Sequence, residues 1–224
     1  MLSTKTYMLI LALLFVHVDI VRSFASSPKP AFSIIDSFKS IFNDKTTQNA
    51  AATDTNKRAV LKEKIFAACQ SKNEDESNKR EKIEALIEEI SPLSPVVGTA
   101  RSPLLQKEWL LVWTTEKEIN FFLDWNIGGQ ISQSINNDQL GNMIEFKKGG
   151  GLGVTGELSF PDEDDDELGI RTNFKFTTAS LDLGRWGKYD LPPVGEGWFD
   201  TVYLDEELRI DTNSRDDILI CTPL

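Results

Sequence analysis

Few residues in this chain have the types and spacing needed for catalysis or metal binding. The only histidine is His17, which lies in an N-terminal segment expected to be removed, so the processed protein would lack a histidine base, triad or metal ligand. No Gly-x-Ser-x-Gly elbow, phosphate-binding loop or Cys-x-x-Cys pair occurs. Carboxylates such as Glu145 or Asp205 would have to converge in one pocket to act as acid and base. The sequence therefore predicts no catalytic residue, no metal site and no cofactor.

Two short segments partly match known ligand-binding motifs. Gly151, Gly153 and Gly156 have the spacing of the dinucleotide fingerprint, but residues 157–161 predict a strand ending in proline, where the fingerprint needs a helix. The acidic run 162–167 lacks the alternating ligands and central glycine of a calcium loop. We interpret the first sequence as a glycine-rich hairpin and the second as a solvated turn.

Charge and aromatic content restrict the partners. The 224 residues carry a formal charge of −11, whereas a nucleic-acid partner requires a basic face. Five tryptophans and thirteen phenylalanines either line an apolar cavity or form ordinary core, and the sequence leaves both open. Arg209 also has two interpretations. Pointing inward it would bind a lipid headgroup or a buried carboxylate, and pointing outward it would be a solvated arginine.

The first 56 residues have the features of N-terminal targeting segments. Residues 1–23 have the basic start and short apolar run of a signal peptide, with cleavage expected between Ser23 and Phe24. Residues 24–56 are rich in Ser, Ala, Thr and Asn, and together with Phe24 they resemble the plastid presequences of algae with secondary plastids. We expect this transit-type segment to be disordered and to be removed by a second cleavage. A retained anchor at 1–23 and an amphipathic membrane helix around residues 32–42 are the alternatives.

Two helices followed by many short strands are predicted for the rest of the chain. Apolar residues recur at helical spacing over residues 57–71 and 79–90. Asn78 is the expected N-cap of the second helix. The apolar stripes of both helices are expected to pack on a sheet. The expected strands cover residues 108–114, 119–123, 130–135, 143–146, 153–160, 169–176, 180–183, 198–204, a stretch from 208, and 217–221. Many short antiparallel strands predict a barrel or a sandwich, and a barrel of about eight strands has room for one small ligand.

Five segments, in order, resemble the plastid lipid-associated protein (fibrillin) family. They are EEISPLSPV at 88–96, LLQKEWLLVWTT at 104–115, GQISQSI at 129–135, NMIEF at 142–146 and GWFDTVYLDEELRI at 197–210. The resemblance covers about residues 57–224. It implies a mainly β, α+β domain in which helices at 57–91 precede a lipocalin-like antiparallel barrel at 104–224. The family pattern then continues with an arginine and a glycine, whereas residues 211–214 here are Asp-Thr-Asn-Ser, so no anion-binding role is carried over to this turn.

The same resemblance implies a non-enzymatic plastid protein that binds or sequesters apolar lipids, such as carotenoids or prenylquinones, at plastoglobules or thylakoids. Trp113 and Tyr203, in the middle of two matching strands, and Arg209 are the expected ligand-binding residues. Expected partners are an apolar plastid lipid and a lipid-body or thylakoid surface, with no nucleic acid, and protein partners are unknown. A structural coat or protein-interaction module with a filled barrel, and a secreted lipocalin-like carrier, are the competing functions. Because plastid stroma is reducing, we expect Cys69 and Cys221 to be free thiols.

Overall fold

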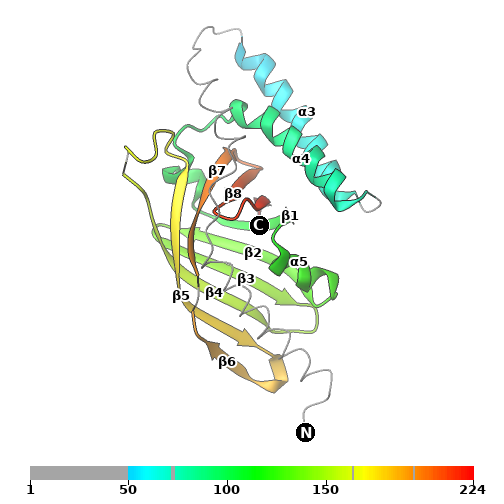
Figure 1. Cartoon of the computed structure of the whole chain (residues 1–224), viewed down its shortest axis with the longest axis vertical. Coiled ribbons are helices and arrows are strands. Elements are labelled where there is room, and N and C mark those ends of the chain that lie inside the picture. The colour runs from blue at the N-terminus through cyan, green and yellow to red at the C-terminus, as the bar shows by residue number, and fades with distance from the viewer. Residues whose placement is uncertain (1–49, 72–73, 163, 194) are drawn as a thin grey trace.

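A computed structural model describes residues 50–71, 74–162, 164–193 and 195–224 (Figure 1). The expected signal peptide and residues 24–49 of the expected transit segment, including Ser23 and Phe24, lie outside the described residues. Residues 50–56, expected to be disordered, instead form the start of the first helix. Two long helices come first, α3 (Ala50–Gln70) and α4 (Glu76–Ile90). Three short 3-10 helices follow: η1 (Ser91–Leu93), η2 (Thr99–Arg101) and η3 (Pro103–Leu105). Among the described residues, no helix is both long and apolar enough to cross a membrane.

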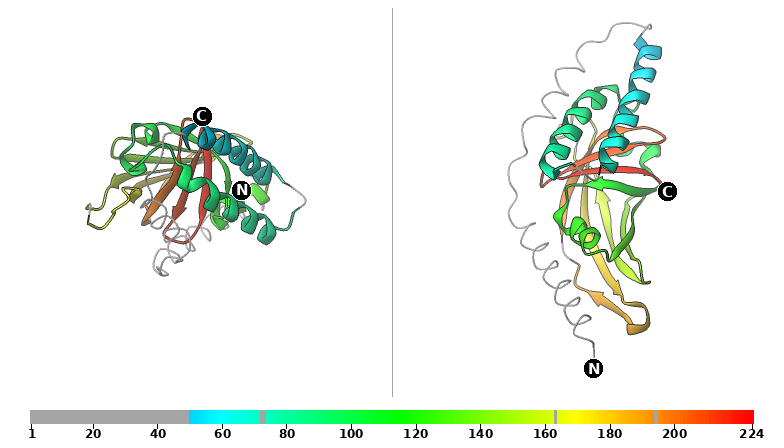
Figure 2. Two further views of the ribbon diagram at one scale, coloured as in Figure 1. Left: turned by 90° about the horizontal axis from the view of Figure 1, so that it is seen from above. Right: turned by 90° about the vertical axis from the view of Figure 1, so that its right-hand side faces the viewer.

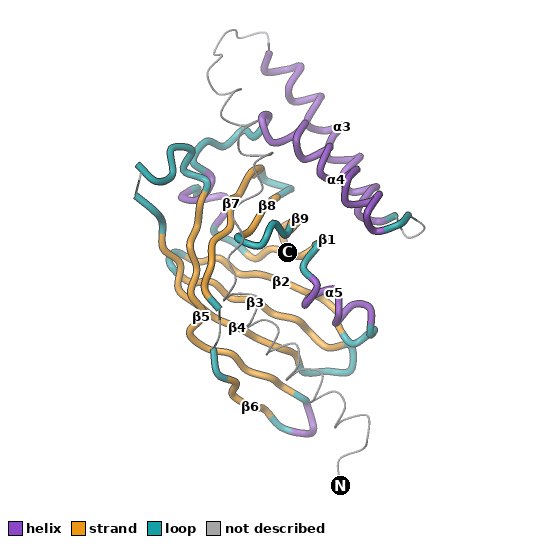
Figure 3. Tube along the Cα trace, viewed as in Figure 1, coloured by secondary structure: helices purple, strands orange, loops and turns teal. Residues whose placement is uncertain are grey.

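The strands form one antiparallel sheet. They are β1 (Glu108–Thr114), β2 (Gly128–Asn136), β3 (Gln139–Phe146), β4 (Gly151–Ser159), β5 (Arg171–Asp182), β6 (Lys188–Leu191), β7 (Glu196–Leu204), β8 (Arg209–Asn213) and β9 (Ile218–Pro223). Their order is β4-β3-β2-β1-β9-β8-β7-β5-β6, and β4 also pairs with β5. All strands except β6 therefore belong to a closed ring of pairings, and the strands curve round together (Figure 3). The predicted combination of a mainly β sheet and two N-terminal helices is confirmed.

Helices α3 and α4 lie together against the C-terminal strands (Figures 1 and 2). Ile65 from α3 and Ile83 and Ile87 from α4 are fully buried, in one cluster with Ile210 of β8 and Ile220 of β9. Burying one such side chain contributes about 1.5–3 kcal/mol. The expectation that both apolar stripes pack on the sheet is confirmed, and this helix-facing core lies on one face of β7, β8 and β9.

The start of α4 differs from the prediction. Asp75 is the N-cap, in an extended conformation, and its carboxylate accepts a hydrogen bond of 3.2 Å from the backbone N–H of Ser77. The predicted N-cap, Asn78, lies within the first turn of the helix. Asp and Asn are equally good caps, so the sequence pattern alone could not choose between them.

One expected strand is a helix. Residues 119–123 belong to α5 (Lys117–Asp124), and the strand prediction was wrong because short apolar runs do not distinguish the two structures. The chain leaves the sheet at Thr114, whose hydroxyl accepts a hydrogen bond from the backbone N–H of Glu116 and whose carbonyl accepts one from the Asn120 side chain. Phe122 then buries its ring against Phe146 of β3, with 6.1 Å between ring centroids. This contact fixes α5 across the end of β2 and β3.

Two other strands also differ. The expected strands 169–176 and 180–183 are one long strand, β5, and β6 was not predicted. The interpretation of the glycine run as a hairpin is confirmed. Gly149 and Gly150 have positive φ in the turn between β3 and β4, and the three fingerprint glycines lie in β4. At Gly156 a side chain would meet the carbonyl oxygen of Lys175, since an added Cβ would lie 2.5 Å from it.

Candidate functional site

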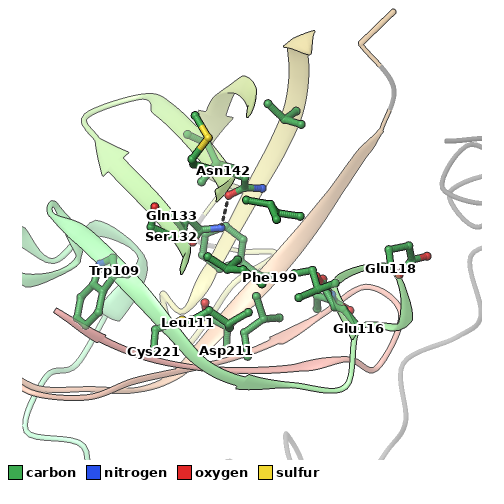
Figure 4. Close-up of a pocket in the computed structure, with 18 of the residues that line it drawn as sticks. Trp109, Leu111, Glu116, Glu118, Ser132, Gln133, Asn142, Phe199, Asp211 and Cys221 are labelled. Atoms are coloured by element: carbon green, nitrogen blue, oxygen red, sulfur yellow. Dashed lines mark hydrogen bonds between the residues drawn. The ribbon is translucent and has the colours of Figure 1, made fainter. Parts of the chain in front are cut away.

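A cavity of about 180 Å³ lies inside the ring of strands (Figure 4). Every strand of the ring contributes to its wall, and α5 contributes at one end. Most of the lining is apolar: Trp109, Leu111, Ile119, Phe122, Ile131, Leu140, Met143, Ile144, Leu152, Val154, Phe174, Phe176, Phe199, Leu219 and Cys221. The polar lining residues are Glu116, Glu118, Ser132, Gln133, Asn142, Arg209, Asp211, Asn213, Ser214 and Arg215.

The alternation of side chains along β8 places a charged pair in this cavity. Arg209, Asp211 and Asn213 line the cavity, while the intervening Ile210 packs in the helix-facing core. This is the period of two that a strand imposes. Arg209 therefore points inward, to the buried carboxylate of Asp211, and not outward to solvent.

Arg209 is held from two sides. Its Nη2 lies 2.7 Å from a carboxylate oxygen of Asp211 and also donates a hydrogen bond to Oε1 of Gln133 on β2. The guanidinium carbon lies 5.1 Å from the centre of the Trp109 ring and 5.9 Å from that of Phe199. The side chain is fully buried, yet Nε and Nη1 have no hydrogen-bond partner. Buried donors without partners are rare in folded proteins, so these two nitrogens mark the site.

The side chains that contact Arg209 form further hydrogen bonds with other polar groups. The hydroxyl of Thr201 donates to Asp211 at 2.8 Å, and the amide of Gln133 donates to Oδ1 of Asn142 at 2.8 Å (Figure 4). Burial raises the pKa of Asp211, and the neighbouring Arg209 and the Thr201 hydroxyl oppose that rise. Arg209, Asp211, Gln133 and Asn142 thus form a polar strip in the wall of a cavity whose lining is mostly apolar.

A second charged cluster joins α5 to the turn between β8 and β9. Arg215 lies 2.8 Å from Glu118 and 3.4 Å from both Glu116 and Asp217, and the Asn213 side chain donates to Glu116 at 2.8 Å. Burial raises the pKa of Glu116 to about 7; Arg215 opposes the rise, and Asp217 and Glu118 add to it. Because α5 forms one end of the cavity wall, this cluster also fixes that end.

Trp113 and Tyr203, expected to contact ligand, are not among the residues that line the cavity. Both belong to the helix-facing core, Tyr203 fully buried and Trp113 partly buried. The register of β1 shifts between Leu111 and Trp113, and that of β7 shifts between Thr201 and Tyr203. A β-bulge reverses the face on which later side chains lie, which is why the alternation from Trp109 does not carry through to Trp113.

The carboxylates considered for catalysis do not meet. Asp205 holds the β7–β8 turn, where it accepts hydrogen bonds from the Tyr203 hydroxyl at 2.6 Å and from Lys62 of α3 at 2.9 Å. Glu145 is exposed on β3. Neither lines the cavity. Within the described residues, no group of three or more His, Cys, Asp or Glu side chains is arranged to hold a metal ion.

Both cysteines are free, as the sequence predicted, and the structure shows that both are also buried. Cys221 lies in the cavity wall and Cys69 in the helix-facing core. Burial raises the pKa of each thiol to about 12. Thiols are nucleophilic as thiolates, so we expect the Cys221 thiol to react slowly at neutral pH.

Sequence reasoning missed Asp211 and Gln133 as partners of Arg209. The Arg-x-Asp spacing at 209 and 211 was a usable signal, because residues two apart on a strand share a face. Gln133 had no such signal, since it meets Arg209 only through the pairings of β2 with β1, of β1 with β9 and of β9 with β8.

The chain was also compared with known proteins. Residues 59–186, more than half of the chain, match the sequence pattern of the PAP_fibrillin family. The chain is similar to the probable plastid-lipid-associated protein 11, chloroplastic, of Arabidopsis thaliana, with 34% identity over 123 residues. That match covers 52% of the chain and 55% of the relative, so the chain spans about half of the relative's length. No solved structure matches this chain. The chain therefore belongs to the PAP_fibrillin family.

Proposed function

We propose that this protein is a plastid lipid-binding protein that holds an apolar lipid, such as a carotenoid or a prenylquinone, in the cavity of a lipocalin-like barrel. Family membership and the name of the Arabidopsis relative support the lipid and the plastid. The closed ring of strand pairings supports the barrel. In this proposal the protein acts by binding, and no residue is assigned to catalysis.

The observation that carries the proposal is the unfilled apolar interior. Protein cores are packed as densely as organic crystals, so a filled barrel would leave few voids larger than a water molecule. The cavity of about 180 Å³ is far larger than that. Its size favours a ligand site over the competing coat or interaction module with a filled barrel, since empty apolar cavities of about 150 Å³ bind small apolar molecules.

The targeting and domain boundaries belong to the same proposal. Residues 1–23 act as a signal peptide, residues 24–56 as a transit segment, and residues 57–224 as the lipid-binding domain with peripheral contact to a plastoglobule or thylakoid surface. A fluorescent protein fused to residues 1–60 should accumulate in the plastid of an alga with a secondary plastid. Accumulation in the medium would support the secreted carrier instead.

Ligand content tests the binding directly. Protein purified from its native source should release a lipid into organic solvent, to be identified by mass spectrometry. A Val154→Phe variant, which adds a ring to the cavity wall, should retain much less lipid. The matched control is Val60→Phe, because Val60 lies on α3 and is 50% exposed. If the wild type is folded and carries no lipid, the filled-barrel module becomes the better function.

A further inference from the structure

We propose that the cavity selects lipids by their head, and that the preferred head is a compact ring carrying a neutral oxygen acceptor, hydrogen-bonded to Nε or Nη1 of Arg209, with the apolar tail leaving the cavity. This inference rests on the proposed function and adds the chemistry of recognition. It is carried by the unpartnered donors, the charge balance beside them and the volume of the cavity.

The first observation is the state of the Arg209 donors. Only Nη2 of its guanidinium is engaged, with Asp211 and Gln133, while Nε and Nη1 have no hydrogen-bond partner in a fully buried side chain. A buried donor without a partner carries its full desolvation penalty. An oxygen acceptor brought by a ligand removes that penalty, whereas a pure hydrocarbon leaves it in place. Lipids with an oxygen on the inserted end should therefore bind more tightly than matched hydrocarbons.

The second observation is the charge balance. Asp211 lies 2.7 Å from Arg209, and both side chains are at most 2% exposed. The other cationic residue that lines the cavity, Arg215, is paired with Glu116 and Glu118 near α5. A ligand carboxylate would add an uncompensated negative charge to a buried site, which is strongly unfavourable. The balance favours a carbonyl or ether oxygen over an anion.

The third observation is size. A cavity of about 180 Å³ is close to the roughly 150 Å³ of an engineered apolar cavity that holds one benzene molecule. Complete enclosure of a long isoprenoid requires several times more space, since sites for drug-sized ligands measure about 300–1,000 Å³. One ring therefore fits inside, and a long tail has to pass outward.

The groups around Arg209 also fix its position before a ligand arrives. Gln133 accepts from Arg209 and donates to Asn142, and Asp211 accepts from Thr201 as well as from Arg209. The guanidinium therefore does not have to be ordered by the ligand. Preorganised donors add affinity and selectivity because less entropy is lost on binding.

The test uses three ligands that share one hexyl chain and one six-membered ring. They are 2-hexyl-3,5,6-trimethyl-1,4-benzoquinone, and a hexylbenzene and a hexylbenzoate that carry the same three methyl groups. Full ring substitution prevents addition of the Cys221 thiol. Titration calorimetry on the delipidated full domain should give a dissociation constant about 10- to 100-fold lower for the quinone than for hexylbenzene or hexylbenzoate. The infrared carbonyl stretch of the bound quinone should shift to lower frequency, which reports the hydrogen bond directly.

The double variant Arg209→Met, Asp211→Leu removes the guanidinium donors without leaving a lone buried charge or adding an amide donor, and it should bring the quinone to the affinity of hexylbenzene. The matched control is Tyr203→Phe, a buried polar change in the helix-facing core, which should leave the selectivity unchanged. If the double variant does not fold, the wild-type ligand series and the infrared shift still decide.

Three results would overturn the inference. Equal affinity for the quinone and hexylbenzene would mean that Arg209 does not recognise the head, while the proposed apolar site would stand. Tightest binding of hexylbenzoate would mean that the guanidinium acts as an anion site. If none of the three ligands binds to a folded protein, the proposed function fails together with the inference.

Discussion

The guanidinium of Arg209 and the carboxylate of Asp211 lie 2.7 Å apart, at neighbouring inward positions of one short strand. Because the two residues are adjacent on the same face of β8, the pair forms within the strand and does not depend on the docking of a distant element. Its other contacts, to Gln133 and Thr201, tie β8 to β2 and β7. Breaking this pair should thus affect both the cavity and the stability of the ring.

The first prediction concerns the stability contributed by this pair. Asp211→Ala leaves the Arg209 charge buried without its counter-ion, and we expect a loss of about 3–5 kcal/mol in the free energy of unfolding, measured by urea denaturation. The control is Glu196→Ala, because Glu196 pairs with Lys175 at 3.9 Å with both side chains more than 70% exposed. That variant should lose less than about 1 kcal/mol. Similar small losses in both variants would contradict the importance of the buried pair.

The second prediction concerns pH. The pKa of Glu116 is raised by burial from 4.5 to about 7, with Arg215 opposing and Asp217 and Glu118 adding to the rise. Between these two values the folded protein keeps a proton that the unfolded chain has released, so raising the pH favours unfolding. Wild type should therefore lose roughly 1–3 kcal/mol of stability relative to Glu116→Gln as the pH rises from 5 to about 8. Urea denaturation of both proteins across this range measures the difference. Parallel curves would show that Glu116 titrates normally.

The third prediction concerns the thiols. Burial raises the pKa of both Cys69 and Cys221 to about 12, so iodoacetamide at pH 8 should label the folded protein very slowly and label both sites quickly in urea. Counting the added groups by mass spectrometry follows the reaction. Non-reducing gels of freshly isolated material should show no intramolecular bridge. Rapid labelling of Cys221 without denaturant would mean that the cavity opens widely in solution.

Local sequence patterns predicted the helices and strands well where the apolar residues followed a single spacing, either that of a helix or that of a strand. The alternating residues 170–176 at the start of β5 and the isoleucine stripe of α4 each follow from residues close together in the chain. The failures arose where a local pattern was ambiguous or interrupted. Residues 119–123 belong to α5, where Phe122 packs on Phe146. This contact joins residues far apart in the sequence, so the residues around Phe122 could not predict it.

The candidate site was predicted only in part for a related reason. Arg209 was identified, yet its partners and the cavity come from the closure of the ring, which joins strands far apart in sequence. Trp113 and Tyr203 were chosen as mid-strand aromatics, and a single register shift in each strand turned them toward the helices. Since a one-residue shift reverses the face of every later side chain, strand orientation past a bulge cannot be derived from alternation alone.

The last prediction concerns the end of the cavity formed by α5. Arg215 holds Glu116 and Glu118, at the start of this helix, to the turn between β8 and β9. In Arg215→Gln the three carboxylates Glu116, Glu118 and Asp217 face one another without their cation. We expect the amides of α5 to exchange hydrogen about tenfold faster, because local opening becomes easier by about 1–2 kcal/mol, while the hairpin of β2 and β3 keeps its protection.

Hydrogen exchange followed by peptide mass spectrometry measures this opening. The matched control is Arg185→Gln, because Arg185 lies in the exposed 3-10 helix η4 (Gly184–Trp186), with its guanidinium 4.6 Å from the Trp186 ring. The control should leave α5 unchanged. Since Ile119 and Phe122 on α5 line the cavity, faster opening in Arg215→Gln should also speed the release of bound ligand. If α5 exchanges at the wild-type rate while ligand release is faster, Arg215 acts on the cavity directly and not by holding the helix.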